Sequence, residues 1–260
     1  MKRHLFLVLN HGDWIEPLPN VKYDRENYLR FFSSPEGGYW GKDEISVYDN
    51  NFNFLAFKDN IRFQQLIKEP YDFIVFVFCG HGGVDNNGRK VIQPQPNGAV
   101  VSLNEIKQAC QGIRTLFISD SCLVLPENSI NESTRLFSSD LLEREDTYAQ
   151  RCKQLYNHYV METSSNAFTA GFGVSVGESA DDDENGGYYS QTLLEVARDI
   201  IPRLKKDPLL KEMDCLSFPA AHNLAAKHVE RITNGKQHPS IEMSRDKAQL
   251  PFIVVPKNLI

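Results

Sequence analysis

Short, continuously apolar runs recur along the chain. The two most strongly apolar runs cover residues 73–78 (FIVFVF) and 115–118 (TLFI), which are rich in β-branched and aromatic residues. Runs of this kind are typical of strands buried on both faces, as in a parallel sheet. Weaker patterns predict further strands over residues 4–10, 44–48, 167–176 and 252–255, and a small hairpin around residues 90–92.

Segments with apolar residues at helical spacing alternate with these strands. They predict helices over residues 24–32, 55–68, 102–112, 140–159, 188–201, 209–212 and 220–233. Ser102 lies three residues before Glu105, the spacing of a capping box, and Pro202 is expected to end the helix that begins at residue 188. The alternation predicts an α/β fold with a mostly parallel sheet of about six strands and helices on both faces.

Composition narrows the function classes. The 260 residues predict a single domain spanning 1–260, because neither an internal repeat nor a long linker divides them. A formal charge of -6 provides no basic surface for nucleic acid. No apolar run approaches the ~20 residues of a membrane span. The five cysteines are odd in number and contain no CxxC pair, which favours free thiols in a reducing compartment such as the cytoplasm.

Reactive side chains follow the two strongest strands. The first strand is followed by His81 and the second by Cys122. Active groups of open α/β sheets collect at the carboxyl ends of the strands, so we expect these two side chains to meet. A thiol is a good nucleophile only as a thiolate, and an imidazole is a suitable base for it. The sequence therefore predicts Cys122 as nucleophile and His81 as general base and proton donor.

These strand ends carry a family resemblance. A strand ending in Gly-His-Gly at 80–82, followed by a strand ending in Asp-Ser-Cys at 120–122, resembles the caspase and metacaspase superfamily of cysteine peptidases, and its bacterial members in particular. The resemblance implies a caspase-like three-layer sandwich that hydrolyses peptide bonds in proteins. It also implies an oxyanion hole formed by the N–H groups of Gly82 and Cys122. The chain departs from the metacaspase pattern at Cys79, where serine is usual, and at residues 123–125, where His-Ser-Gly is usual.

A second cysteine competes for the role of nucleophile. Residues 108–112 match the caspase signature Q-A-C-[RQG]-G and place Cys110 in its reactive position. Cys110 is expected to lie at the end of a helix, however, whereas a caspase nucleophile follows a strand. We therefore favour Cys122 and predict that Cys110 is a small buried side chain.

The resemblance also suggests a specificity pocket. Asp120 lies two residues before Cys122, a spacing that places both side chains on one face of a strand. In metacaspases an aspartate at this position binds the Arg or Lys that precedes the cut, and Asp24 resembles a second aspartate of that pocket. Asp24 would equally serve as a helix N-cap, and Asp120 as a turn cap. If both line the pocket, the enzyme cuts after basic residues. Cys79 takes the place of a pocket serine, and Ser175 is a candidate contact for the substrate.

Residues 177–180 and 186–190 resemble the stretch after the fifth strand of bacterial caspase-like proteins, where the chain forms a pocket wall and then a helix. Residues 177–187 are predicted to form a polar loop. It contains four consecutive acidic side chains: Asp181, Asp182, Asp183 and Glu184. Such runs are usually solvated. The resemblance adds calcium activation, although the run lacks the ligand spacing of a known calcium loop. No cofactor is otherwise required.

Two further features bear on the site. His11 follows the first predicted strand and could line the cleft, but it lacks the family position of the base. The connection 123–165 lies where caspases are cut during maturation, with candidate cut sites at Arg135, Arg144 and Arg151.

Three functions are compatible with this pattern. The first is a cysteine endopeptidase that acts on protein or peptide substrates, with an activating partner protein left open. By family analogy, its setting is a stress, cell-death or antiphage system. The second is a catalytically silent caspase-like regulatory or binding module, which retention of both His81 and Cys122 disfavours. The third is a nucleotide-binding α/β domain, which lacks support because no glycine-rich phosphate motif follows the first strand.

Overall fold

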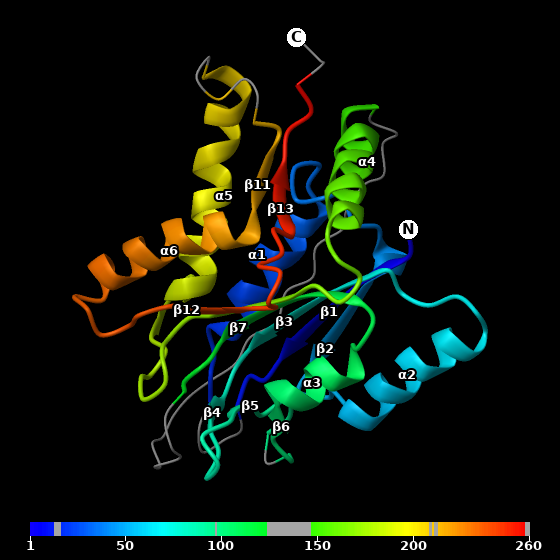
Figure 1. Cartoon of the computed structure of the whole chain (residues 1–260). Coiled ribbons are helices and arrows are strands. Elements are labelled where there is room, and N and C mark those ends of the chain that lie inside the picture. Colours follow the sequence, from blue (N-terminus) through cyan, green and yellow to red (C-terminus); the bar gives the residue numbers. More distant parts are fainter. Residues whose placement is uncertain (13–16, 97, 124–146, 208–209, 211–212, 258–260) are drawn as a thin grey trace.

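A six-stranded sheet forms the centre of the protein in the computed structural model (Figure 1), which describes residues 1–12, 17–96, 98–123, 147–207, 210 and 213–257. The strand order is β12-β8-β7-β3-β1-β2. All neighbouring pairs are parallel except β12 with β8. The strands are β1 (Arg3–Leu9), β2 (Ile45–Asp49), β3 (Phe73–Cys79), β7 (Arg114–Asp120), β8 (Phe168–Phe172) and β12 (Ser240–Met243).

Helices cover both faces of the sheet (Figure 1). One layer contains α1 (Val21–Ser33), α4 (Thr147–Glu162), α5 (Tyr188–Lys206) and α6 (Phe218–Ile232). The other contains α2 (Phe54–Leu66) and α3 (Leu103–Ala109). Alternate side chains of β1 enter different cores, since Leu7 packs in the core of the first layer and Phe6 in that of the second. The central strands are apolar throughout because both of their faces are covered.

Seven short strands lie outside the central sheet in the part of the chain that the structure describes. They are β4 (Gly82–Val84), β5 (Lys90–Ile92), β6 (Val101–Ser102), β9 (Asp182–Asp183), β10 (Gly186–Gly187), β11 (Cys215–Ser217) and β13 (Pro251–Val254). The first three form a small antiparallel sheet, while β9 pairs with β10 and β11 with β13. A single turn of 3₁₀ helix, η1 (Lys42–Glu44), precedes β2. Among the described residues, no helix is both long and apolar enough to cross a membrane.

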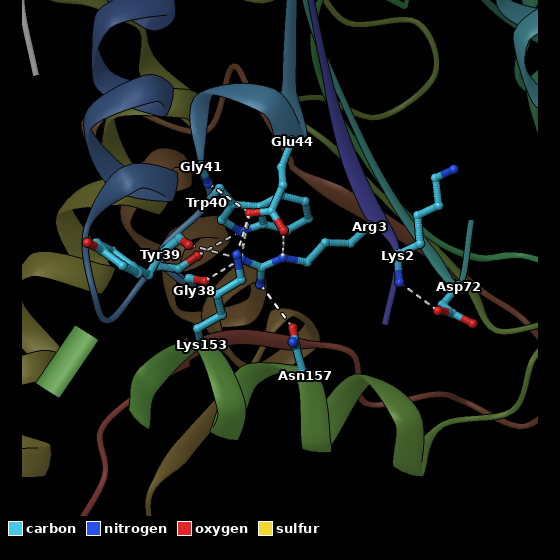
Figure 2. A network of polar contacts seen from close by, with 11 residues as sticks. Lys2, Arg3, Gly38, Tyr39, Trp40, Gly41, Glu44, Asp72, Lys153 and Asn157 are labelled. Carbon is cyan, nitrogen blue, oxygen red and sulfur yellow. Dashed lines mark hydrogen bonds and ion pairs between the residues drawn. The ribbon is translucent and has the colours of Figure 1, made fainter. Parts of the chain in front are cut away.

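Arg3 is buried at the N-terminal end of β1 (Figure 2). Its guanidinium donates to Glu44 Oε1 and Oε2, both at 3.1 Å, and to Asn157 Oδ1 at 3.1 Å. It also donates to the carbonyl oxygens of Gly38 and Tyr39. A buried charge with this many partners ties β1, η1 and α4 together.

The three-layer α/β fold is confirmed, with two corrections to the strands. The predicted strand at 252–255 exists as β13, but it pairs with β11 outside the central sheet. The sixth strand of the sheet is β12, whose half-exposed, mixed sequence carries no strand signal. The capping box at Ser102 and Glu105 is present. Residues 140–146 of one predicted helix lie outside the described residues, as does the predicted helix at 209–212 apart from Leu210.

The expectation that Pro202 ends a helix is wrong, because α5 continues through it to Lys206. Proline removes one hydrogen-bond donor and crowds the preceding turn, which usually terminates a helix. Here the turn that follows carries Leu204, which is 1% exposed and packs in the core of the first layer. Burial of this side chain offsets the lost hydrogen bond.

Candidate active site

The carboxyl ends of β3 and β7 lie side by side. Cys79 pairs with Asp120 at the last position of the ladder, and Gly80 N donates to Asp120 O at 3.2 Å. Gly80 has a φ of +148°, and a Cβ on it would lie 2.8 Å from Asn10 Cβ. Only glycine fits this turn, and the chain leaves it directly into His81.

The segment after β3 also contacts the segment after β7. A Cβ on Gly82 would lie 2.6 Å from Ser121 Oγ and 3.0 Å from Cys122 O. The backbone beside His81 therefore touches the backbone of Cys122, and both residues are partly exposed. The segments that carry His81 and Cys122 therefore lie side by side, and the meeting of their side chains stays a prediction.

The thiol of Cys122 faces the backbone of Ala180. Ala180 N donates to Cys122 Sγ at 3.3 Å, and Sγ lies 3.9 Å from Ala180 O. Burial raises the pKa of Cys122 and the charge of Asp120 adds to this rise, while the hydrogen bond from Ala180 N opposes it. A thiol with a raised pKa is protonated at neutral pH, so it needs a base to become a nucleophile.

Cys110 lies in a different environment. It caps the C-terminal end of α3, is 2% exposed and packs in the core of the second layer. Burial raises its pKa to about 12. The residue that matches the caspase signature is therefore a sealed thiol that does not follow a strand.

Two aspartates are buried next to this site. Asp24 on α1 is 2% exposed and accepts a hydrogen bond from Gly187 N at 3.1 Å. Asp120 at the end of β7 is 6% exposed and accepts one from Ser190 N at 2.7 Å. Burial raises the pKa of Asp24 well above its ordinary value, and the charge of Asp120 adds to the rise. Burial also raises the pKa of Asp120, to about 6.

The partners of the two aspartates within the described residues are uncharged. In the part of the chain that the structure describes, no Lys or Arg forms an ion pair with Asp24 or Asp120. The buried thiol of Cys79 lies nearby, 3.8 Å from Ser190 Oγ. Burial raises the pKa of Cys79, and the charges of Asp24 and Asp120 raise it further. We call Asp24, Asp120 and Cys79 the acidic cluster.

The alternative role of Asp24 as a helix N-cap is wrong. Asn20 occupies the N-cap position of α1, and Asp24 follows in the first turn with its carboxylate directed to Gly187 N. Asp120 is the last residue of β7 and accepts from the first turn of α5, so it does not cap its own turn. Both aspartates therefore join segments that are distant in the sequence.

The remaining candidates have other contacts. Ser175 Oγ donates to His238 O at 2.8 Å. His11 Nε2 lies 3.1 Å from Asp49 Oδ1, at the edge of the sheet. Arg151 is exposed on α4, whereas Arg135 and Arg144 lie outside the described residues.

The acidic run at 181–184 does not form a metal site in the structure. Asp182 and Asp183 form β9, and Asp183 Oδ1 accepts hydrogen bonds from Asn185 N and Gln191 Nε2, both at 2.8 Å. Across the described residues, no group of three or more His, Cys, Asp or Glu side chains is placed to hold a metal ion. Calcium activation stays a prediction.

Sequence reasoning placed Ala180 and Ser190 in segments that resemble a pocket wall and the helix after it, but it predicted neither the contact of Ala180 with Cys122 nor that of Ser190 with Asp120. Ala180 contacts Cys122 only through its backbone, which leaves no side-chain signal in the sequence. Ser190 contributes its backbone N–H to Asp120 because it lies in the first turn of α5. A polar loop with paired glycines before a helix is the one sequence feature that marks this segment.

A mostly parallel sheet between two layers of helices, with a histidine and a cysteine just after neighbouring strands, is typical of cysteine peptidases with a caspase fold. The family model described as "Caspase domain" matches residues 3–250, and the chain belongs to this family. The family is one of cysteine proteases, which act on proteins.

Solved structures agree on the fold. Caspase-1 from Spodoptera frugiperda superposes with a TM-score of 0.55 at 14% identity, covering 98% of this chain and 88% of that one. A protein from Geobacter sulfurreducens superposes with a TM-score of 0.57 at 14% identity, covering 98% of this chain and 100% of that one. At this identity the similarity shows the fold alone. No curated protein sequence matches the chain.

Proposed function

We propose that the protein is a cysteine endopeptidase that cuts after Arg or Lys with a Cys122–His81 dyad. One observation carries the proposal. The segments that bear His81 and Cys122 are in contact, and Asp120, two residues before Cys122, belongs to a buried acidic cluster that has no cation paired to it among the described residues. Buried carboxylates are costly unless they are paired, so this arrangement favours a site that receives a cation from outside.

The chemistry follows from the order of groups at the strand ends. His81 takes the proton of Cys122, and the resulting thiolate attacks the carbonyl carbon of the scissile bond. The N–H groups of Gly82 and Cys122 donate to the oxyanion that forms. His81 then gives its proton to the leaving amine as the C–N bond breaks. A water molecule, deprotonated by His81, hydrolyses the thioester and restores the thiol.

Specificity for a basic residue follows from the acidic cluster. Burial holds the pKa values of Asp24 and Asp120 high, and a nearby negative charge adds to each rise, that of Asp120 at Asp24 and that of Asp182 at Asp120. A guanidinium or ammonium group placed between the two aspartates offsets this negative charge and supplies charge-assisted hydrogen bonds. The planar guanidinium has the better geometry for two carboxylates, so Arg is expected to be preferred over Lys.

The setting of the activity is part of the same proposal. We place the enzyme in the cytoplasm, in a stress, cell-death or antiphage system, under the control of calcium or of an activating partner protein. The support is the family resemblance and the unpaired cysteines, since all five in the chain are free. Cleavage within residues 123–165 would be a further mode of control.

The experiment uses the purified chain and short peptides that carry Arg, Lys, Asp or Leu before a fluorescent amide, with and without calcium. Cleavage after Arg or Lys is expected, with loss in Cys122→Ala and His81→Ala and retention in Cys110→Ala. Loss in Cys110→Ala alone would reverse the assignment of the nucleophile. Cleavage only after Asp would remove the basic pocket. Silence toward every peptide would favour the regulatory module.

A further inference from the structure

Two consecutive glycines, Gly186 and Gly187, lie very close to the buried carboxylates of Asp24 and Asp120. A Cβ on Gly186 would lie 2.3 Å from Asp24 Oδ1, and a Cβ on Gly187 would lie 2.3 Å from Asp120 Oδ2. Real Cβ atoms do not approach oxygen this closely, so neither glycine can gain a side chain without movement. The pair thus touches both aspartates of the acidic cluster, one glycine to each carboxylate.

The backbone conformations of the two glycines separate two explanations for their presence. Gly186 has a φ of +118°, which by itself favours glycine. Gly187 is the N-cap of α5 with a φ of -67° and a ψ of 138°, a conformation that any residue adopts. At position 187, therefore, the contact with Asp120 and not the backbone excludes a side chain.

The segment that carries the glycines cannot easily withdraw. We call residues 182–187, which comprise β9, β10 and their turn, the wall segment. Gln191 Nε2 donates to Gly186 O at 2.6 Å, and Asn27 Nδ2 donates to Asn185 O at 3.3 Å. Gly187 N also donates to Asp24. Because of these hydrogen bonds to α1 and α5, an added methyl group must either displace a carboxylate or break the hydrogen bonds that hold the wall segment.

We propose that Gly186 and Gly187 are specificity-determining residues, because their missing side chains let the wall segment hold Asp24 and Asp120 in position for a basic side chain of the substrate. This inference rests on the proposed cleavage after Arg or Lys. Each guanidinium nitrogen must come within about 2.7–2.9 Å of a carboxylate oxygen. A methyl group at position 187 occupies space next to Asp120 Oδ2 and shifts that oxygen. Recognition of charge is lost, while the strand ends that carry His81 and Cys122 are untouched.

The test compares peptides with Arg or citrulline before the cut, since citrulline has the shape of arginine without its charge. The wild-type chain is expected to prefer Arg by about 10- to 100-fold in kcat/KM, the range of a hydrogen bond to a charged group. Gly187→Ala is expected to lower this preference by at least about 10-fold. The rate of alkylation of Cys122 by iodoacetamide should stay near the wild-type rate, because this small reagent reacts with the thiol and does not occupy the specificity pocket.

The control is Gly112→Ala. Gly112 also has a positive φ, +85°, but a Cβ there meets nothing within 4 Å. This variant carries the backbone strain of a glycine replacement without the contact, so its preference for Arg should equal that of the wild type. Gly186→Ala combines strain and contact and should resemble Gly187→Ala.

The outcomes separate the two proposals. If the wild type cleaves after Arg and Gly187→Ala keeps the full preference for Arg, the inference is overturned and the proposed function stands. If the wild type cleaves no basic peptide, both fail. Should Gly187→Ala not fold, the double variant Gly187→Ala/Asp120→Ala decides, since removal of the carboxylate makes room for the methyl group. Recovery of folding in the double variant supports the contact, and failure of both variants to fold overturns it.

Discussion

The sheet buries charge at both of its ends, but only one end neutralises it. At the N-terminal end, Arg3 is 3% exposed and shares its charge with Glu44. Its guanidinium also stacks on Trp40, 4.2 Å from the ring centre. At the carboxyl end, Asp24 and Asp120 are equally buried and accept backbone hydrogen bonds, with no Lys or Arg paired to them among the described residues.

The paired charge at the N-terminal end is typical of a structural role, whereas the two neighbouring carboxylates at the carboxyl end are typical of a binding site. A buried ion with every donor satisfied stabilises the arrangement around it, and breaking one partner leaves the other uncompensated. A pair of buried like charges does the opposite, since each raises the free energy of the folded state. A protein retains such a pair where something else supplies the counter-charge. The following predictions test this contrast, from the largest effect to the smallest.

The largest effect is expected from Cys122→Ala at the carboxyl end. Loss of the nucleophile should lower kcat by roughly 10⁴-fold or more, by comparison with nucleophile replacements in other proteases. The melting temperature should change little, because Cys122 is partly exposed. Peptide cleavage and thermal unfolding measured on one preparation check both expectations. Cys110→Ala should show the reverse pattern, with activity kept and stability lowered, since its thiol is buried.

At the N-terminal end, Arg3→Met should lower the free energy of unfolding by about 3 kcal/mol, because the partly buried Glu44 loses its two contacts with Arg3 and keeps Lys153, at 2.9 Å, as a cationic partner. Although burial alone would raise it, the hydrogen bonds and charge of Arg3 lower the pKa of Glu44 to about 2. The contribution of Glu44 is therefore present above its ordinary pKa of 4.5 and is lost as pH falls toward 2. Urea unfolding at pH 7 measures the loss. The neighbouring Lys2→Met breaks an exposed pair with Glu69 and should cost less than about 1 kcal/mol.

Asp120→Asn should stabilise the fold while it impairs recognition of Arg. The pKa of Asp120 is raised from 3.8 to about 6, so the folded state favours the neutral carboxyl. Its stabilising effect is complete below the unfolded pKa and is lost as pH rises through about 6. An uncharged amide should therefore add about 2–3 kcal/mol at pH 7.5 and almost nothing at pH 4. Urea unfolding at the two pH values distinguishes this from a loss of stability at both, which would contradict the contrast between the two ends.

The smallest effect is a pH dependence of specificity. As pH rises through about 6, Asp120 ionises and its attraction for a guanidinium grows. The preference for Arg over citrulline in kcat/KM should rise by about 10-fold between pH 5 and pH 7.5, which corresponds to one charge-assisted contact. A ratio of two substrates cancels the titration of the dyad, which acts on both. A flat ratio would show that Asp120 does not touch the substrate.

The sequence predicts the strand ends better than it predicts the pocket. Continuous apolar runs mark β3 and β7, and parallel neighbours end at one edge, so the meeting of the His81 and Cys122 segments follows from local pattern. The contact of Asp24 with Gly187 spans 163 positions and depends on how α1 packs on α5, which no local pattern encodes. Asp24 and Asp120 were singled out through a family resemblance, and their burial is seen only in the structure.

Other features were missed because their signals are weak or misleading. Ala180 reaches Cys122 through its main chain, and β12 is short and partly polar because it lies at the edge of the sheet. Pro202 carries a strong local stop signal that packing of Leu204 overrides. Local signals are thus reliable where one interaction dominates and fail where tertiary contacts compete with them.

The ladder between β3 and β7 has a consequence for biogenesis. Cys79 pairs with Asp120 at the end of this ladder. The hydrogen bonds along both strands therefore fix where the His81 segment lies relative to the Cys122 segment. A slip by a single position would move every side chain of the shifted strand to the opposite face of the sheet and would displace His81 relative to Cys122. If Cys122 is the nucleophile, as we propose, a newly made chain acquires a reactive thiol there only after these strands have paired in the right register, and the rate of labelling of that thiol would report when the sheet forms.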